Sequence, residues 1–273
     1  MSAVKSFMEA ISVTEVTVPD EDGAPSRYRG TISPEWFGPP GPNGGFVAAI
    51  VLRAIRTAVG DATRAPRSLT LHYLRPPSEG EVEVAVEIER SGRTATTCSA
   101  RMSQGGKTMV VALCVLTHDY DGEHEWSVPP PDVPPPEEVD AIELDDTFPK
   151  LFLQLEMRSL FGVIPFTGGD EAVTGGWLRT RGDEGITPEL VCFYTDAWWP
   201  APFSVMTKPL AAPTLELTMH FRAKPDPEDP FVLARFTTDA AIDGLFDERG
   251  DIWDRNGRLL AQSRQLALLR PMA

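Results

Sequence analysis

The stretch Thr187–Pro202, TPELVCFYTDAWWPAP, organises the rest of this 273-residue chain. It predicts a short helix over 188–202, with Thr187 as the cap and Pro188 at the first helical position. Most of its side chains are apolar, which is typical of a helix that is buried on every side. Asp196 lies inside this apolar part. A buried carboxylate must be paired, protonated or used in chemistry.

Two interpretations of Asp196 stay open from the residues alone. It is either a structural carboxylate, paired or facing a wet gap, or a functional acid. Two polar residues downstream favour the second interpretation: Thr214 and Gln265 fall on strands that we expect to wrap this helix. A poorly solvated carboxylate has a raised pKa, which suits a general base.

Outside this stretch the chain reads mainly as β-strands. Residues 81–89 alternate strictly between Val or Ile and Glu, apart from Ala85, which predicts a strand with one buried face. A second buried helix is expected from Asn43-Gly44-Gly45 to Gly60, and a short leading helix over 1–12. The other expected strands are 13–18, 26–32, 68–74, 93–104, 107–117, 151–161, 171–181, 215–223, 231–241, 244–254 and 258–269, with a turn at 20–24.

The two halves of the chain repeat each other. LTLHY at 69–73 matches LTMHF at 217–221, and each follows its helix and precedes a turn that contains proline. The helix and the strands around it therefore occur twice, which predicts an α+β fold. We expect repeats at 1–120 and 146–273, joined by a proline-rich acidic linker at 121–145.

Composition limits the classes of function. The net charge of −15 argues against non-specific binding to nucleic acid and to anionic membranes. No window reaches the roughly 18 apolar residues of a membrane span, and residues 1–13 lack a signal-peptide pattern. Cys98, Cys114 and Cys192 are too scattered for a disulfide framework or a zinc site. We expect a cytoplasmic protein with buried reduced thiols and no metal or cofactor.

The sequence resembles the double hotdog fold and, more narrowly, the acyl-CoA thioesterase II family and its thioesterase-like relatives. In the first half the resemblance rests on GGF at 44–46 and on SLTLHYLRPPSEGEVEV at 68–84. In the second half it rests on Asp196, on Thr214 ahead of TMHFR, and on NGRLLAQSRQLALLR at 256–270. Glu216-Leu217 stands where the family usually has Asp-His, so we expect the edge of the site to differ from that of the family.

The resemblance implies an acyl-CoA thioesterase in which Asp196, Thr214 and Gln265 hold and activate a water for thioester hydrolysis. Attack would be direct, with no covalent enzyme intermediate. Thr218 lies four residues beyond Thr214 along the chain and stays an alternative to it.

Further residues are expected to contact the acyl-CoA substrate. A backbone N–H at a helix start can polarise a carbonyl oxygen, and glycine permits close approach. An aromatic side chain can line an acyl tunnel, and an arginine can meet the phosphates of coenzyme A. The expected contacts are Asn43, Gly44, Gly45, Trp198 and Arg75.

Two other functions stay open. A hotdog enoyl-CoA hydratase would pair the helix Asp with a His about five residues later, and position 201 is Ala. A catalytically silent acyl-binding or acyl-CoA-binding protein would keep the pocket without the chemistry. The resemblance also implies fatty acid metabolism and a homo-oligomer, expected to be a dimer. A G-x-S-x-G motif is absent, which argues against a serine hydrolase.

Overall fold

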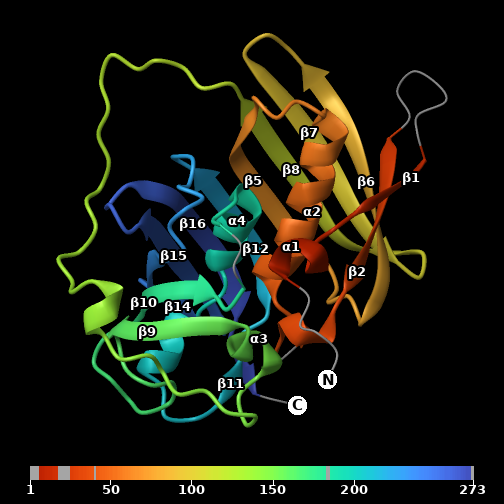
Figure 1. Cartoon of the computed structure of the whole chain (residues 1–273). Coiled ribbons are helices and arrows are strands. Elements are labelled where there is room, and N and C mark those ends of the chain that lie inside the picture. The colour runs from red at the N-terminus through yellow and green to blue at the C-terminus, as the bar shows by residue number, and fades with distance from the viewer. Residues whose placement is uncertain (1–5, 18–24, 40, 183–184, 272–273) are drawn as a thin grey trace.

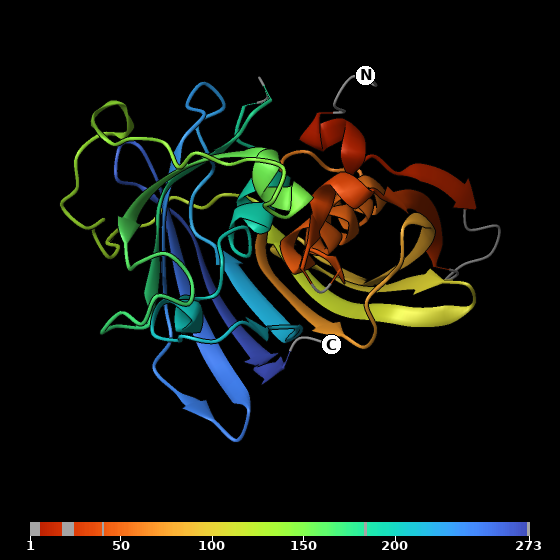
Figure 2. The ribbon, with the colours of Figure 1, turned by 90° about the horizontal axis from the view of Figure 1, so that it is seen from below.

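The computed structural model of the chain describes residues 6–17, 25–39, 41–182 and 185–271. Within these residues, strands from both halves form one large antiparallel sheet that curves around the helices (Figures 1 and 2). The expected turn at 20–24 and the first five residues of the expected leading helix lie outside the described residues. The rest of that helix is α1 (Phe7–Ala10).

Helix α2 (Gly44–Val59) is the central helix of the first half, as predicted. Asn43 caps it, because its Oδ1 accepts a hydrogen bond of 2.8 Å from the backbone N–H of Phe46. Gly60 ends it in the left-handed conformation, at φ 64°. Residues 45–52 are all buried, so this helix forms the middle of the core.

The first-half strands lie where the alternation predicts them. In β6 (Gly80–Ser91), Val82, Val84 and Val86 are buried under α2, whereas Ile88 is 44% exposed at an irregularity in the pairing. The other elements of this half are β1 (Thr14–Thr17), β2 (Ser26–Ile32), η1 (Pro34–Trp36), β3 (Phe37–Gly38), β4 (Gly41–Pro42), β5 (Ala65–Tyr73), β7 (Ala95–Gln104) and β8 (Lys107–Thr117).

The second half repeats this order with shorter helices. Two expected strands are shorter than predicted. The strand expected over 151–161 begins only at Leu155, because Lys150–Leu153 form helix α3 after Pro149, and the strand expected over 231–241 ends at Thr237. Leu151 enters the core from this short helix. The strands are β9 (Leu155–Phe161), β10 (Val173–Thr180), β11 (Leu210–Ala211), β12 (Thr214–Phe221), β13 (Val232–Thr237), β14 (Ala241–Ile242), β15 (Leu245–Asp254), β16 (Leu259–Leu268) and β17 (Arg270–Pro271).

Helix α4 (Pro188–Tyr194) is shorter than the predicted helix, and Asp196 does not lie within it. Both the N–H and the side-chain hydroxyl of Thr195 bond to the carbonyl of Cys192, at 3.3 and 2.8 Å, which closes the last turn. Pro200 has no N–H to continue a helix, and the chain resumes in the 3₁₀ turn η3 (Ala201–Ser204). Asp196 therefore lies in the turn between α4 and η3.

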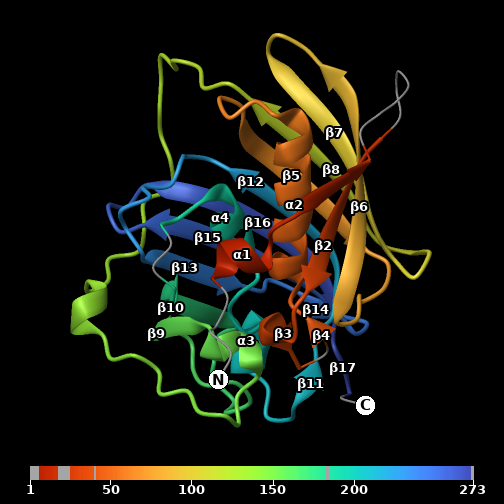
Figure 3. The same cartoon turned by 45° about the vertical axis from the view of Figure 1, so that its right-hand side comes forward.

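The two halves join through the strands that carry the repeated letters. Strand β5 pairs antiparallel with β12 so that Leu71 faces Leu217 and Thr70 faces Thr218 (Figure 3). Thr70 and Thr218 are equivalent in the repeat, and their hydroxyl oxygens are 3.0 Å apart. The pairing is thus symmetric about this threonine pair: the start of β5 lies beside the end of β12, and the end of β5 lies beside the start of β12.

Part of the proline-rich segment packs on the outer face of the second-half sheet. The indole N–H of Trp177 donates to the carbonyl of Pro134 at 2.8 Å, and that of Trp253 to Val128 at 3.0 Å. Val133 and Val139 pack on the same apolar cluster. Because these bonds fasten the segment, it follows the sheet (Figure 1). The division into 1–120, 121–145 and 146–273 stays a prediction.

All three cysteines are buried free thiols. None of the helices in the described ranges has the length and the apolar character needed to cross a membrane.

Close packing between α2 and α4 predicts that Gly45→Ala destabilises the protein. A Cβ at Gly45 would lie 2.6 Å from the carbonyl oxygen of Phe193, which is backbone and cannot turn aside. Replacing Gly by Ala in a helix normally gains up to about 1 kcal/mol, but forced overpacking costs about 1–3 kcal/mol. We expect a lower melting temperature by calorimetry. In the control Gly92→Ala, the new Cβ would lie 3.5 Å from its nearest neighbour, the carbonyl oxygen of Ala95. An equal loss of melting temperature in that variant would contradict the packing argument.

Candidate active site

Asp196 of the second half contacts the N-terminus of α2 of the first half. Its Oδ2 accepts hydrogen bonds of 3.0 Å from the backbone N–H of Gly45 and from Nδ2 of Asn43. Asn43 Nδ2 also donates to the backbone carbonyl of Asp196 at 2.6 Å. A helix N-terminus favours negative charge, because its first N–H groups have no partner within the helix. The two halves therefore build this part of the site together.

The environment of Asp196 shifts its pKa upward. Burial raises the pKa from 3.8 to about 6, and hydrogen bonds from Gly45, Gly44, Asn43 and Gln265 partly oppose the rise. A carboxyl group with a pKa near 6 is ionised at neutral pH and still takes up a proton readily. The site thus contains an acid whose proton affinity suits a general base.

Gln265 and Thr214 lie beside each other. The hydroxyl of Thr214 donates to Oε1 of Gln265 at 3.2 Å, and Gln265 is 5% exposed. The alternative hydroxyl, Thr218, points to other partners, since it bonds to Glu216 and contacts Thr70. The geometry places Thr214 with Gln265. It also places Gln265 close enough to Asp196 to lower the pKa of that carboxyl.

A second buried acid, Glu248, belongs to the same cluster. Its Oε2 accepts a hydrogen bond of 2.6 Å from the N–H of Ala201, and its Oε1 accepts one of 3.1 Å from Nε2 of Gln265. Burial raises the pKa of Glu248 to about 8, and the negative charge of Asp196 adds to the rise. The cluster therefore holds two buried carboxyl groups with different pKa values.

The residues expected to contact the substrate differ in burial and in their hydrogen-bond partners. The backbone N–H of Asn43 donates to the carbonyl of Trp36 at 3.0 Å, and Arg75 is exposed and donates to the carbonyl of Thr108 at 3.0 Å. Trp198 is buried, 5.2 Å from Trp199 between ring centroids. Among the described residues its indole N–H has no hydrogen-bond partner.

Two residues at this cluster, Glu248 and Tyr73, were not predicted from the sequence. Glu248 occupies an inward position of β15, in register with buried Phe246 and Ile252, so the alternation of that strand contained the signal. The hydroxyl of Tyr73 donates to the carbonyl of Gly44 at 2.8 Å and helps to fix the start of α2. Strand alternation predicts that Glu248 points inward, but it does not predict which residue it meets.

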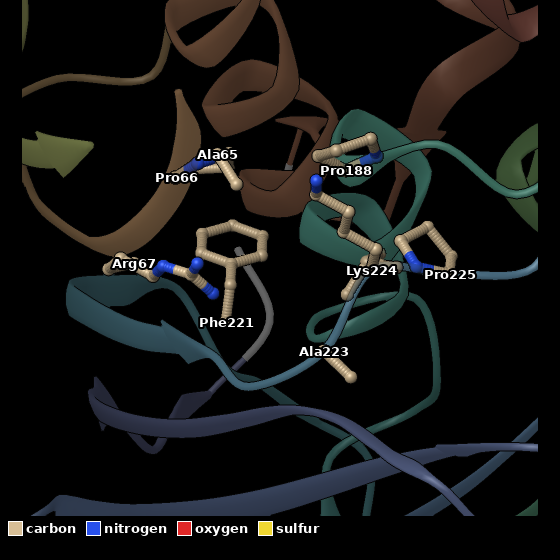
Figure 4. Close-up of a pocket in the computed structure, with 9 residues that line it drawn as sticks. Ala65, Pro66, Arg67, Pro188, Phe221, Ala223, Lys224 and Pro225 are labelled. Atoms are coloured by element: carbon tan, nitrogen blue, oxygen red, sulfur yellow. The ribbon is translucent and has the colours of Figure 1, made fainter. Parts of the chain in front are cut away.

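A surface pocket lies away from this cluster (Figure 4). It is lined by the first residues of β5, by Pro188 and Val191 of α4, and by Phe221 and Lys224 at the far end of β12. Both of its cations are already paired: Arg67 lies 2.6 Å from Asp119, and Lys224 bonds to the same carboxylate. Because Thr214 begins β12 and Phe221 ends it, the pocket and the cluster lie at opposite ends of that strand.

Two family models match this chain in sequence. Residues 32–117 match the acyl-CoA thioesterase N-terminal domain, and residues 128–269 match the acyl-CoA thioesterase C-terminal domain. An uncharacterized protein of Mycobacterium tuberculosis is 27% identical over 296 residues, which cover 96% of this chain and 99% of that protein.

Solved structures show the same fold. A protein of unknown function with a hotdog fold from Alicyclobacillus acidocaldarius superposes with a TM-score of 0.85 at 22% identity, covering 99% of this chain and 100% of that one. An acyl-CoA thioesterase II of Mycobacterium marinum superposes with a TM-score of 0.75 at 21% identity, covering 98% and 99%. The predicted double hotdog fold is thereby confirmed.

The raised pKa of Asp196 predicts how Asp196→Asn changes stability with pH. The folded protein holds this proton up to about pH 6, whereas the ordinary value is 3.8. The raised pKa of Asp196 therefore adds to the free energy of unfolding in full below pH 3.8, and this stabilisation is lost as pH rises through about 6. Asparagine keeps an oxygen for Gly45 and carries no charge. We expect the variant to melt at a higher temperature than the wild type near pH 8.

The difference between the two melting curves should shrink toward about pH 4, where Asp196 is protonated in the folded protein. A variant that melts lower than the wild type near pH 8 would show that the hydrogen bonds of the carboxylate outweigh its burial.

Proposed function

This chain belongs to the acyl-CoA thioesterase family, and from this premise we propose that it hydrolyses acyl-CoA thioesters at the cluster around Asp196. The observation that carries the proposal is the position of Asp196. It is a carboxylate with a raised pKa, it lies at the N-terminus of α2, and Gln265 is beside it. Base, water-binding groups and a source of positive potential are therefore close together.

In the proposed reaction Asp196 takes a proton from a water molecule whose oxygen attacks the thioester carbonyl carbon. Gln265 and Thr214 hold that water at the correct angle, which limits its motion before attack. The tetrahedral intermediate then collapses, the C–S bond breaks, and the coenzyme A sulfur leaves with the proton from Asp196. The products are a carboxylic acid and a free thiol, and no bond to the protein forms.

The first N–H groups of α2 are suited to stabilise the developing oxyanion. The N–H of Asn43 is bonded to Trp36, and the N–H of Gly45 donates to Asp196. Gly44 is our candidate donor: its N–H is directed at Asp196 in the free site and would turn to the oxyanion when the thioester binds. A side chain at Gly44 would meet Asp196 Oδ2 at 2.9 Å and the hydroxyl of Tyr73 at 3.3 Å. Glycine at this position therefore leaves room for the thioester carbonyl beside the base.

The other expectations remain proposals of the same kind. Trp198 would line the path of the acyl chain, and Arg75, which is exposed, would meet the coenzyme A phosphates. A homodimer, a cytoplasmic location and a place in fatty acid metabolism are likewise predictions. A catalytically silent acyl-binding protein is the alternative that the activity assay separates from an enzyme.

Release of free thiol from acyl-CoA substrates of increasing chain length tests the proposal. We expect hydrolysis by the wild type and a loss of roughly 100-fold or more in kcat for Asp196→Asn, because the base is removed. Thr218→Val is the matched control, since Thr218 bonds away from the cluster. Binding of acyl-CoA without thiol release would identify a silent binder and reject the enzyme.

The pKa of Asp196 also predicts the pH dependence of the reaction. The base must be unprotonated, so kcat/KM should rise with pH and level off above about 6. Below that pH it should fall about tenfold per unit, because one proton blocks the base. A pH profile without a step in this range would exclude Asp196 as the base.

A further inference from the structure

Glu248 has no place in the reaction proposed above, yet it touches the cluster directly. It is 6% exposed and lies opposite Gln265 in the pairing of β15 with β16. Each carboxyl oxygen accepts one hydrogen bond: Oε2 from Ala201 N–H at 2.6 Å, and Oε1 from Gln265 Nε2 at 3.1 Å. The carboxyl group is thus held from two sides, by η3 and by β16.

The hydrogen bond to Glu248 and the one from Thr214 give the oxygen and the nitrogen of the Gln265 side-chain amide different partners. The amide oxygen accepts from Thr214 at 3.2 Å, and the NH₂ group faces Glu248 and lies near Asp196. An amide has two donors on nitrogen and an acceptor oxygen. A rotation by half a turn would direct the amide oxygen at the carboxylate of Asp196, which is ionised above about pH 6, and would take the NH₂ group away from Oε1 of Glu248. Two acceptors would then face each other at Asp196, which is costly in a buried site.

We propose that Glu248 is a positioning residue that fixes the Gln265 amide with its oxygen toward Thr214 and its NH₂ group toward the two acids. This inference rests on the proposed function, in which Gln265 binds the attacking water. Glu248 itself does not touch the substrate. Its effect on the reaction passes through Gln265.

The charges around Glu248 support a role other than stability. Asp196 faces it from the turn after α4, and Asp247 is its neighbour on β15, where it pairs with Arg264 at 2.6 Å. Burial raises the pKa of Glu248, the negative charges of Asp196 and Asp247 add to the rise, and no cation among the described residues forms an ion pair with it. A buried acid of this kind costs stability as it ionises, which is typical of functional sites.

The same two strands provide a matched control. Asp251 of β15 accepts a hydrogen bond of 2.9 Å from Nε2 of Gln262 on β16. This acid–glutamine pair has the same chemistry, but its residues lie on the opposite face of the sheet, away from Asp196. Asp251→Asn therefore repeats the change from acid to amide without reaching the cluster.

Glu248→Gln is the informative variant, because it keeps the size and reverses the hydrogen bond. The oxygen of the new amide is held by Ala201 N–H, so its NH₂ group meets the NH₂ group of Gln265. Two donors then face each other, and Gln265 must turn over or move away.

The first experiment reads the position of Gln265 by NMR of its side-chain NH₂ group, assigned by its absence in Gln265→Ala. In the wild type we expect two separate proton signals that exchange slowly with water. In Glu248→Gln they should shift and exchange faster, and in Asp251→Asn they should not change. Unchanged signals in Glu248→Gln would overturn the proposal, whether or not the protein hydrolyses thioesters.

The second experiment is a double-mutant cycle on acyl-CoA hydrolysis. Glu248→Gln should lower kcat roughly tenfold or more while KM changes less than about threefold. In a Gln265→Ala background the same change should alter kcat less than about twofold, because the effect passes through Gln265. Equal losses in both backgrounds would overturn the positioning role. Absence of hydrolysis by the wild type would reject the proposed function and leave the NMR result to decide on Glu248.

Discussion

The contact between the carboxylate of Asp196 and the N-terminus of α2 is the interaction on which the rest of the site depends. It joins residues 151 positions apart in the sequence, with Gly45 N–H donating to Asp196 Oδ2. The contact requires the backbone of α2 at Gly45 to pack directly against the backbone of α4 at Phe193. Only glycine at position 45 allows this approach, because a Cβ there would lie 2.6 Å from the carbonyl oxygen of Phe193. The same approach buries the acid and raises its pKa. Packing of the two halves and proton affinity at the site therefore have one cause.

The duplicated fold explains why the polar residues gather here. Strands β5 and β12 pair antiparallel, so Tyr73 at the end of β5 and Thr214 at the start of β12 lie at the same end of the strand pair. Strand β16 then pairs with β12 and brings Gln265 beside Thr214. The two repeats differ at this cluster: α2 is long and supplies its N-terminus, whereas α4 is short and leads into the turn that carries Asp196.

Much of this arrangement could be predicted from the sequence, and the rest depends on contacts between distant segments. The repeated letters at 69–73 and 217–221, the caps of α2 and the alternation in β6 are local signals, and they predicted the fold correctly. The position of Asp196 after α4 was not predicted, because the apolar run continues through Trp199 while Thr195 ends the helix by bonding back to Cys192. Glu248 was missed because its importance lies in its partner, Gln265, which is 17 positions away.

The choice between Thr214 and Thr218 illustrates the same limit. Both lie on β12, four residues apart, and strand propensity does not separate them. In the folded chain Thr218 lies at the seam against its repeat equivalent, Thr70, whereas Thr214 reaches Gln265. A tertiary contact, and not a propensity, decides which hydroxyl joins the cluster.

The central claim is that Asp196 acts as a base on water and forms no bond to the acyl group. A single turnover with excess enzyme in heavy-oxygen water tests this most directly, with mass spectrometry of the acid and of the protein. Direct attack predicts one heavy oxygen in the released acid and none in Asp196. Heavy oxygen in Asp196, with an unlabelled acid from the first turnover, would show attack by the carboxylate itself and contradict the account.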